Sequence, residues 1–188
     1  MTRIISGRAG GTVLDVPPKG TRPTSDRVRE SLFGSLESAG LLDDARVADL
    51  YAGSGALGLE SLSRGAASAD LVEFSAPAAT LIRRNADRVR TAGVAAPARV
   101  HRASVTTFLT ASGLEWDLVF LDPPYDLSDD ELTRALVALA PRLSADATVI
   151  VERAKRSAAP DWAAAGLEAE RDRAYGDTTM WWGRPRGA

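Results

Sequence analysis

Between residues 46 and 152 the chain alternates short apolar runs with longer amphipathic segments, a rhythm that few folds accommodate. The apolar runs have the length and composition of buried strands, and Gly65 and Gly93 close two of the amphipathic segments as glycines close helices. We expect strands at 47–51, 69–74, 98–103, 118–122 and 147–152, and helices at 56–63, 78–92, 105–111 and 129–139. Strands that alternate with helices form βαβ units, so the sequence predicts an α/β fold with a mostly parallel sheet covered on both faces.

The N-terminal segment departs from this alternation. Two strand-like runs, 3–6 and 12–16, flank a glycine-rich turn, which predicts a β-hairpin. The helix expected after the hairpin has Ser25 or Asp26 as its cap, an apolar stripe at helical spacing and Gly40 at its end.

The C-terminal segment departs from it as well. We expect a short helix near Trp162 and then two strands, 167–173 and 178–182, that pair antiparallel at the edge of the sheet. Trp181 and Trp182 are neighbours in a strand, so they should point to opposite faces, with one of them in the core.

Composition excludes several classes of protein. The 188 residues and 45% hydrophobic content suit one domain with a substantial core, with room for a small extension. No apolar run is long enough to cross a bilayer and no signal segment begins the sequence, so we expect a cytoplasmic protein. The absence of cysteine and the presence of a single histidine argue against disulfides and against a zinc site. We expect that histidine, His101, to be a surface residue of its strand without a partner.

Charge is distributed unevenly along the chain. The net charge is −2, so a nucleic-acid partner would need a local basic surface. Residues 1–22 carry one acid, Asp15, against four basic residues, which are Arg3, Arg8, Lys19 and Arg22. Residues 83–102 carry six arginines against Asp87, an arrangement at least as typical of a solvated helix face. The first cluster is the more informative because it lies in the hairpin segment.

Asp122-Pro123-Pro124-Tyr125 stands at the exit of the strand expected at 118–122. Proline cannot donate to a sheet ladder, so the strand must stop here, while the proline carbonyls can still accept hydrogen bonds. Asp122 and the Pro123 carbonyl can each accept one hydrogen of an –NH2 group, and the Tyr125 ring offers a flat face for stacking. The motif therefore suits a planar base with an exocyclic amine. A plain strand-ending turn is the alternative.

A glycine-rich segment follows the first strand of the alternating region. Gly53, Gly55 and Gly58 match the G-x-G-x-x-G fingerprint of dinucleotide sites, and Glu73 ends the next strand where an acid would hold a ribose. Asp49, however, would repel a pyrophosphate and attract an ammonium group. S-adenosylmethionine carries an ammonium, a sulfonium, a carboxylate and a ribose but no phosphate, so Asp49 favours this cofactor over a nicotinamide or flavin dinucleotide.

Each part of that cofactor has a candidate partner. Gly53 and Gly55 would let the backbone approach closely, and Glu73 would accept both ribose hydroxyls. The N-terminal amides of the helix expected at 56–63 would hold the carboxylate, and Asp49 the amino group. Ligands of open α/β sheets lie outside the carboxyl ends of the strands. Four polar side chains fall at such ends and should share one crevice: Asp49, Glu73, Ser104 and Asp122.

These motifs resemble a known family. The motifs at 49–58, 73 and 122–125 look like those of Rossmann-like methyltransferases that use S-adenosylmethionine to modify an exocyclic amine. Segments 3–7, 21–24 and 29–33 are similar to the RsmD family of bacterial 16S rRNA (guanine-N2) methyltransferases, and the resemblance covers nearly the whole chain.

The resemblance implies a fold, a substrate and site residues. The fold would be a seven-stranded sheet with an antiparallel edge strand, with a hairpin extension at 1–24 that contacts RNA and a catalytic domain at 25–188. The partner would be 16S rRNA, in the small ribosomal subunit or an assembly intermediate, and the enzyme would be a monomer without a metal. Asp122, Pro123 and Tyr125 would be catalytic, and the basic residues of segment 1–22 would contact RNA. Where the family places Asn or Asp against the adenine, this chain has Ser104, beside the Val105 N–H.

Three other functions are compatible with the residues. A DNA adenine-N6 methyltransferase can share the Asp-Pro-Pro-Tyr motif, but it normally needs a target-recognition domain for which 188 residues leave no room. The glycine fingerprint read literally suggests a nicotinamide-dependent oxidoreductase. The third is an RNA-binding module that keeps the fold without activity.

Overall fold

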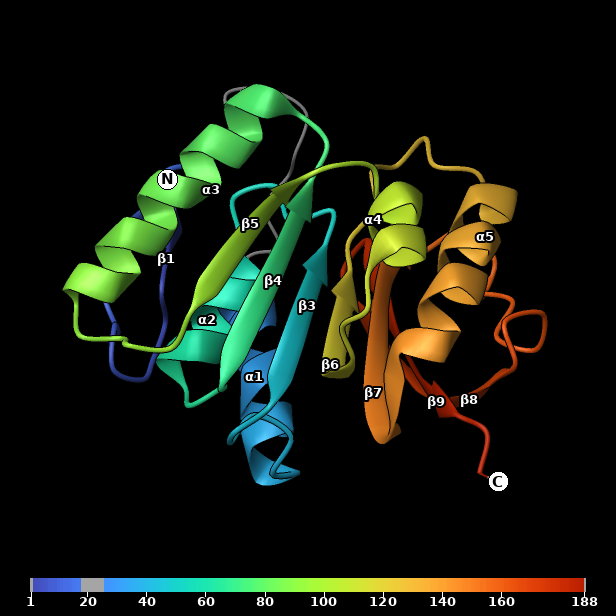
Figure 1. Ribbon diagram of the computed structural model, residues 1–188. Coiled ribbons are helices and arrows are strands. Elements are labelled where there is room, and N and C mark those ends of the chain that lie inside the picture. The colour runs from blue at the N-terminus through green and yellow to red at the C-terminus, as the bar shows by residue number, and fades with distance from the viewer. Residues whose placement is uncertain (1, 18–25, 188) are drawn as a thin grey trace.

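The computed structural model describes residues 2–17 and 26–187, and its main feature is a seven-stranded sheet (Figure 1). The strand order is β5-β4-β3-β6-β7-β9-β8. The strands are β3 (Arg46–Leu50), β4 (Ser68–Glu73), β5 (Ala98–Arg102), β6 (Trp116–Leu121), β7 (Leu143–Ala154), β8 (Leu167–Tyr175) and β9 (Thr178–Pro185). The strands from β5 to β7 are parallel, and β9 runs antiparallel to both β7 and β8. The predicted parallel sheet with an antiparallel pair at its edge is confirmed. Within that pair, β9 lies next to β7 and β8 is the edge strand.

The helices follow the strands as the alternation predicts. They are α1 (Asp26–Ser38), α2 (Ala56–Ser63), α3 (Ala76–Thr91), α4 (Val105–Ala111) and α5 (Asp129–Leu139), with a short 3-10 turn η1 (Ala140–Arg142) before β7. From β3 the chain moves outward to β4 and β5 and then returns to β6 on the other side of β3. The strand order therefore reverses between β3 and β6, and such switch points are where α/β sheets bind ligands.

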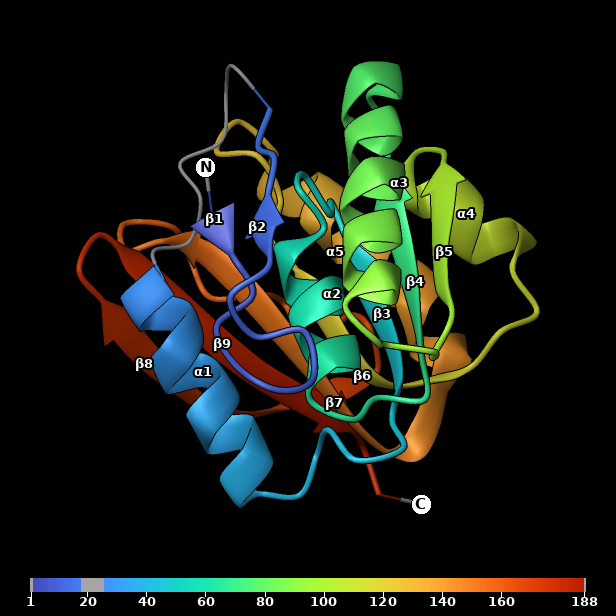
Figure 2. The same ribbon diagram turned by 90° about the vertical axis from the view of Figure 1, so that its left-hand side faces the viewer.

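The sheet has a hydrophobic core on each face. One core joins the sheet to α1, α2 and α3 and includes Phe33, Leu71 and Ile82. The other joins it to α4 and α5 and includes Leu109 and Leu136. Figure 2 shows α1 and α4 on opposite sides of the strands. Trp182 is 2% exposed in the first core, and Trp181 packs against the second, so their predicted opposite orientations are confirmed.

The N-terminal hairpin packs against α2. Its strands are β1 (Thr2–Arg3) and β2 (Val13–Leu14), which pair antiparallel and are shorter than the sequence predicts. The buried Glu60 carboxylate accepts hydrogen bonds from the backbone N–H groups of Ile5 and Ser6 at 2.7 and 3.0 Å. Ile4 belongs to the same core as α1, α2 and α3. The hairpin is thus continuous with the main core, and the domain boundary predicted after residue 24 lies outside the described residues.

The prediction of a short helix near Trp162 is wrong, because residues 162–166 form turns. The Trp162 carbonyl accepts from the N–H groups of Ala165 and Leu167, which closes the chain back toward β8. The Trp162 ring is 5% exposed and lies against Gly183 of β9, where a Cβ atom would come within 2.5 Å of it. Packing of one tryptophan thus overrides the helix propensity of the alanines that follow.

His101 has a partner, contrary to the expectation from sequence. Its Nε2 lies 2.8 Å from Oδ1 of Asp70, a buried side chain on the neighbouring strand β4. The other Asp70 oxygen accepts from the indole N–H of Trp116 at 3.0 Å. The pairing of β4 with β5 brings Asp70 and His101 together, and the Trp116 side chain reaches Asp70 from β6, which is not paired with β4. The distance between these residues in sequence hides the contact.

Residues 2–17 and 26–187 include no helix that is both long and apolar enough to cross a bilayer. Nor does this part of the chain bring three or more His, Cys, Asp or Glu side chains together as ligands for a metal ion.

Candidate active site

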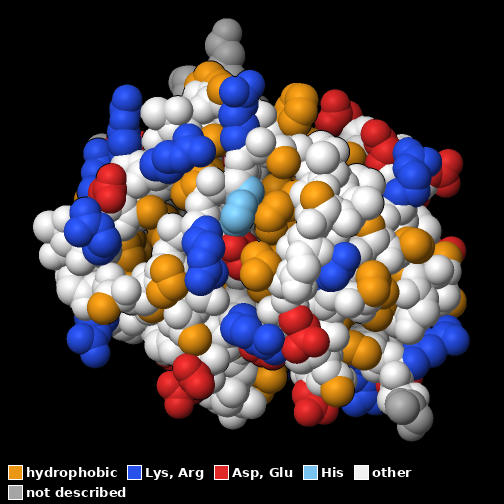
Figure 3. Space-filling model, in the orientation of Figure 1, with side chains coloured by type: hydrophobic (Ala, Val, Ile, Leu, Met, Phe, Trp, Pro, Cys, Tyr) orange, Lys and Arg blue, Asp and Glu red, His pale blue; other side chains and the backbone are white. Residues whose placement is uncertain are grey.

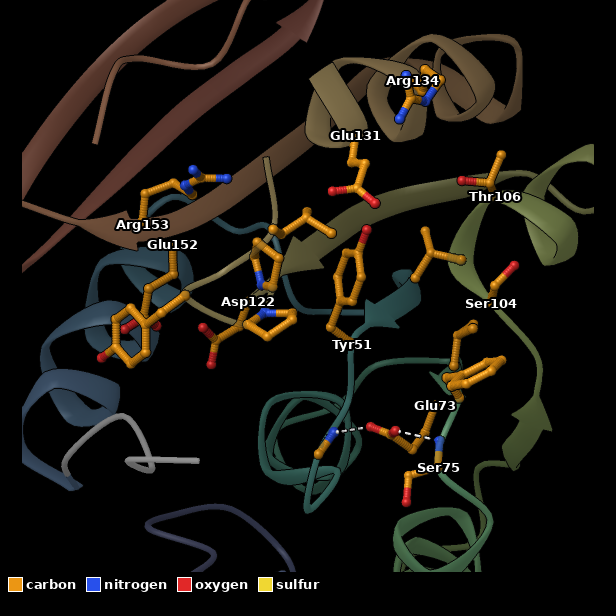
Figure 4. A pocket seen from close by; sticks show the side chains of 18 of the residues that line it. Tyr51, Glu73, Ser75, Ser104, Thr106, Asp122, Glu131, Arg134, Glu152 and Arg153 are labelled. Carbon is orange, nitrogen blue, oxygen red and sulfur yellow. Dashed lines mark hydrogen bonds between the residues drawn. The ribbon is translucent and has the colours of Figure 1, made fainter. Parts of the chain in front are cut away.

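A cavity of about 610 Å³ opens at the carboxyl ends of the parallel strands (Figure 4). This volume lies within the range of about 300–1,000 Å³ typical of small-molecule sites. The segments that follow β3, β4, β5 and β6 line the cavity, together with the end of β7. It brings together most of the residues predicted to bind cofactor or act in catalysis: Gly53, Glu73, Ser104, Val105, Asp122, Pro123 and Tyr125.

Asp49 and Gly55 are predicted cofactor residues that are not part of the cavity lining. Asp49 is 2% exposed, and its Oδ2 accepts from the Gly58 N–H in the first turn of α2 at 2.9 Å. A Cβ atom at Gly55 would lie 3.0 Å from the side chains of Ile82 and Leu71, so this glycine lets α2 pack against its neighbours. The expectation that Asp49 lines the crevice is therefore wrong, because the start of α2 covers its carboxylate.

The buried Asp49 carboxylate still acts electrostatically on the site. Burial raises the pKa of Asp49 to about 7, and the charge of Glu73 adds to the rise, while the Gly58 hydrogen bond opposes it. Asp49 in turn contributes to the raised pKa of Asp122. A ligand cation placed nearby would favour ionised Asp49.

Glu73 is held in one orientation by the backbone. Its Oε2 accepts from the Gly53 N–H at 3.0 Å, and its Oε1 accepts from the Ser75 N–H at 2.8 Å. Each carboxylate oxygen can accept further hydrogen bonds, so the pair can still receive two ribose hydroxyls. Phe74 follows Glu73 in the lining and is 75% exposed, which offers an apolar face for an adenine ring. Sequence reasoning missed Phe74, although an aromatic residue directly after a strand-ending acid was a usable signal.

Ser104 lines the cavity, but its hydroxyl is used locally. It accepts from the Thr107 N–H at 3.2 Å as the cap of α4 and lies 2.7 Å from the Thr107 hydroxyl. Val105 is the first residue of α4 and is buried. Both residues therefore line the cavity, while the Ser104 hydroxyl caps α4.

The Asp122-to-Tyr125 motif forms the wall at the switch point of the sheet. The Asp122 N–H lies 3.4 Å from the Leu50 carbonyl, so the motif leaves β6 beside the end of β3. Burial raises the pKa of Asp122 well above its usual range, and the charges of Glu152 and Asp49 reinforce the effect. Tyr125 is 69% exposed, and its ring is accessible for stacking.

Other polar residues that line the cavity were missed from the sequence. Glu152 and Arg153 belong to the end of β7, and Glu131 and Arg134 to α5. Glu152 ends the predicted strand 147–152, the same position that singled out Glu73 and Asp122, so the signal was available. Tyr51 has a φ of 67°, which is unusual for a residue with a side chain, and its hydroxyl points toward Glu131 (Figure 4). Burial raises the Tyr51 pKa to about 12, with a contribution from the Glu131 charge.

The predicted RNA contacts lie outside the cavity. Arg3 projects from β1 with 66% of its side chain exposed and lies 3.8 Å from Asp26. Arg8 is exposed in the hairpin turn, close to Gly93 after α3. Lys19 and Arg22 lie outside the described residues.

Known proteins share both the sequence and this architecture. A family model described as conserved hypothetical protein 95 matches residues 2–184. Ribosomal RNA small subunit methyltransferase D of Escherichia coli K12 is 44% identical over 124 residues, which are 65% of this chain and 60% of that protein. The protein of the same name from Haemophilus influenzae is 33% identical over 156 residues, 81% of this chain and 79% of that protein.

A solved structure of yhhF from Escherichia coli is similar over the whole fold. It has a TM-score of 0.81 and 34% identity, covering 100% of this chain and 99% of that one. The match therefore includes the sheet, the covering helices and the N-terminal hairpin. The chain belongs to the family described as conserved hypothetical protein 95, the RsmD family that the sequence motifs resemble, and it has the Rossmann-like fold of methyltransferases.

Proposed function

We propose that this protein transfers a methyl group from S-adenosylmethionine to the exocyclic N2 of a guanine in 16S rRNA. The observation that carries the proposal is the meeting of Glu73 and Asp122, one suited to a ribose and the other to an amine, in one cavity of the right size. The names of the curated relatives support the substrate class, although the aligned segment spans only 60% of the Escherichia coli protein.

The donor set fits S-adenosylmethionine. Burial raises the pKa of Asp49 to about 7, and an ammonium group nearby would stabilise the ionised carboxylate. The backbone holds the Glu73 carboxylate in one orientation, in which it would accept two hydroxyls, and the exposed Phe74 ring would offer a face to the adenine. The charge of Asp49 would repel a pyrophosphate, which disfavours a nicotinamide dinucleotide. The cofactor, once bound, would supply an electrophilic methyl group on a sulfonium.

Asp122 and Pro123 then prepare the target nitrogen. The N2 lone pair of guanine is delocalised into the ring, so the amine is a poor nucleophile. Hydrogen bonds from its two N–H groups to Asp122 and to the Pro123 carbonyl would favour a tetrahedral nitrogen whose lone pair points away from the ring. One such preorganised partner is commonly worth about 3 kcal/mol in a transition state. Asp122 can afterwards accept the proton or pass it to water.

The target base has to leave its stack to reach this wall. Flipping costs a few kcal/mol, less in a loop than in a helix, and the exposed Tyr125 ring can stack on the displaced base. We further propose that residues 1–24 form the RNA-contacting extension, in which Arg3, Arg8, Lys19 and Arg22 would bind phosphates and set the position of the RNA. The enzyme would act as a cytoplasmic monomer.

Comparison of 16S rRNA from cells with and without the protein tests the proposal directly. Mass spectrometry should find one methyl group missing from a guanine in the deletion strain. The wild-type gene should restore it, whereas Asp122→Ala should lower the rate at least about 100-fold with little effect on cofactor affinity. An unchanged methylation pattern in the deletion strain would contradict the proposal.

A DNA adenine-N6 methyltransferase is the second candidate, favoured only by its shared Asp-Pro-Pro-Tyr motif. Transfer of a labelled methyl group into DNA but not into small-subunit RNA would support it. Binding of a nicotinamide dinucleotide without binding of S-adenosylmethionine would support an oxidoreductase instead. Full rescue of the deletion strain's growth by Asp122→Ala would point to a non-catalytic RNA-binding role.

A further inference from the structure

Glu152 lies beside Asp122 at the carboxyl ends of two adjacent parallel strands. Leu121 of β6 is the register partner of Val151 in β7. Asp122 directly follows Leu121 in the chain, and Glu152 directly follows Val151. Neighbouring strands are about 4.8 Å apart, so the two side chains start close together. Both residues line the cavity, and Figure 4 shows them side by side.

Strand alternation sets the face to which both side chains point. Phe120 and Ile150 are register partners in the core that includes α1 and the hairpin, whereas Leu121 and Val151 belong to the opposite core. The next position returns to the first face, so Asp122 and Glu152 both project toward the side of α1 and the hairpin. The raised pKa of Asp122 agrees with this proximity, because the Glu152 charge adds to the effect of burial.

Two adjacent carboxylates match one edge of one base. The Watson–Crick edge of guanine presents two neighbouring donors, N1–H and the N2 amine. Hydrogen bonds from these donors would favour the ionised form of both carboxylates, which accepts hydrogen bonds only. Adenine and cytosine place an unprotonated ring nitrogen next to their amine, and its lone pair would face the second carboxylate. A single carboxylate before the prolines cannot distinguish guanine from adenine or cytosine, because every exocyclic amine can donate to it.

Building on the proposed function, we propose that Glu152 reads the base by accepting the guanine N1–H while Asp122 accepts an N2–H. Glu152 is then a specificity residue that contacts the substrate, and it explains how an amine-binding motif is restricted to guanine. Enzymes that act on a flipped base read its Watson–Crick edge in this way.

The test compares two target bases in one RNA fragment. The fragment spans the guanine identified with the deletion strain and carries either guanine or 2-aminopurine at the target position. 2-Aminopurine keeps the 2-amine but has a lone pair at N1. Wild-type enzyme should prefer guanine, and Glu152→Gln should lower kcat/KM for guanine roughly 10- to 100-fold. The guanine to 2-aminopurine ratio should fall at least tenfold, because the glutamine amide can donate to the N1 lone pair.

Two further variants make the result specific. Glu152→Asp keeps a carboxylate and should retain the preference for guanine, and Glu170→Gln removes an exposed carboxylate on β8 and should change nothing. Thermal unfolding and cofactor affinity check that each variant is folded. If turnover of Glu152→Gln is too slow to follow, the dissociation constants of the two fragments give the same ratio.

The outcomes separate this inference from the function on which it rests. If wild-type enzyme does not methylate the guanine fragment, the proposed function fails. If it does, and Glu152→Gln keeps the wild-type ratio, the reading role of Glu152 is overturned while the function stands. A pH profile that shifts equally for both bases, with the guanine to 2-aminopurine ratio still at its wild-type value, would likewise overturn it, because Glu152 would then act only on the ionisation of Asp122.

Discussion

Asp49 is, at the scale of one residue, a buried acid whose ionisation costs stability. Its carboxylate is buried with one backbone hydrogen bond, and its pKa is raised to about 7. A protein selected only for stability would replace such a group with a neutral one. The acid is useful if a cation arrives, as the ammonium group of the proposed cofactor would.

Asp49→Asn should stabilise the protein at neutral and alkaline pH. Between pH of about 4 and 7 the folded state holds a proton that the unfolded state releases, so the wild-type free energy of unfolding falls as pH rises through this window. The variant has no such loss, and its amide oxygen can still accept from the Gly58 N–H. It should gain roughly 1–4 kcal/mol over the wild type at pH 8 and nothing near pH 4.

Urea unfolding at pH 4.5, 6 and 8 would measure this difference, with Asp172→Asn as a surface control. The same variant should bind S-adenosylmethionine at least about tenfold more weakly, measured by calorimetry. A loss of stability at pH 8, or an unchanged cofactor affinity, would contradict the role assigned to Asp49.

Contact between two elements, the N-terminal hairpin and α2, fixes the position of the proposed RNA-binding segment. Glu60 and Ser63 of α2 both bind backbone groups of the hairpin, and the Ser63 hydroxyl donates to the Ser6 carbonyl at 2.6 Å. Gly7 has a φ of 82°, and a Cβ atom there would clash with the Ser63 carbonyl. The hairpin turn therefore depends on glycine for its backbone conformation and for its close approach to α2.

Gly7→Ala and Gly11→Ala form a matched pair that separates these two requirements. Gly11 has a similar φ of 85° but no atom within 4 Å of the added Cβ position. Both variants should lose about 1–2 kcal/mol from backbone strain, and Gly7→Ala should lose roughly 1–3 kcal/mol more because the turn must move away from α2. Thermal or urea unfolding measures both, and equal losses would show that the contact with Ser63 is unimportant.

On the face of the molecule drawn in Figure 3, charge is unevenly distributed, although the net charge of the chain is only −2. Figure 3 shows basic side chains gathered over α3 and β5, and acidic ones near the start of α5. Asp15 of the hairpin segment forms an ion pair with Arg88 of α3 at 2.9 Å, which joins the hairpin to the basic helix. The hairpin segment and α3 are therefore in contact, and we expect their exposed basic side chains to attract an RNA backbone.

Removal of two hairpin charges should change the salt dependence of RNA binding. Arg3→Ala combined with Arg8→Ala should weaken binding to small-subunit RNA and lower the slope of log affinity against log salt by up to about 2, since each phosphate contact contributes ~0.7–0.9. Arg184→Ala combined with Arg186→Ala removes two charges near the C-terminus and should leave the slope unchanged. Filter binding over a salt series measures both, and equal slopes for the two variants would exclude the hairpin contact.

Much of this molecule follows from local sequence patterns. The alternation from residue 46 predicts the parallel sheet, because hydrophobic periodicity and glycines at helix ends are properties of short segments. The rule that ligands bind at carboxyl ends of strands likewise brings Glu73, Ser104 and Asp122 to one cavity.

Tertiary packing decided the rest. No local pattern shows that α2 covers Asp49 or that the hairpin is bound to Glu60. Nor does one show that Trp162 lies in a turn and packs on Gly183. Nor does one show Glu152 beside Asp122, since their proximity comes from the pairing of β6 with β7. Sequence by itself determined which elements form and which residues end them, because those choices depend on neighbours in the chain. Only the folded structure decided which of those residues meet and which become buried, because both depend on contacts between distant segments.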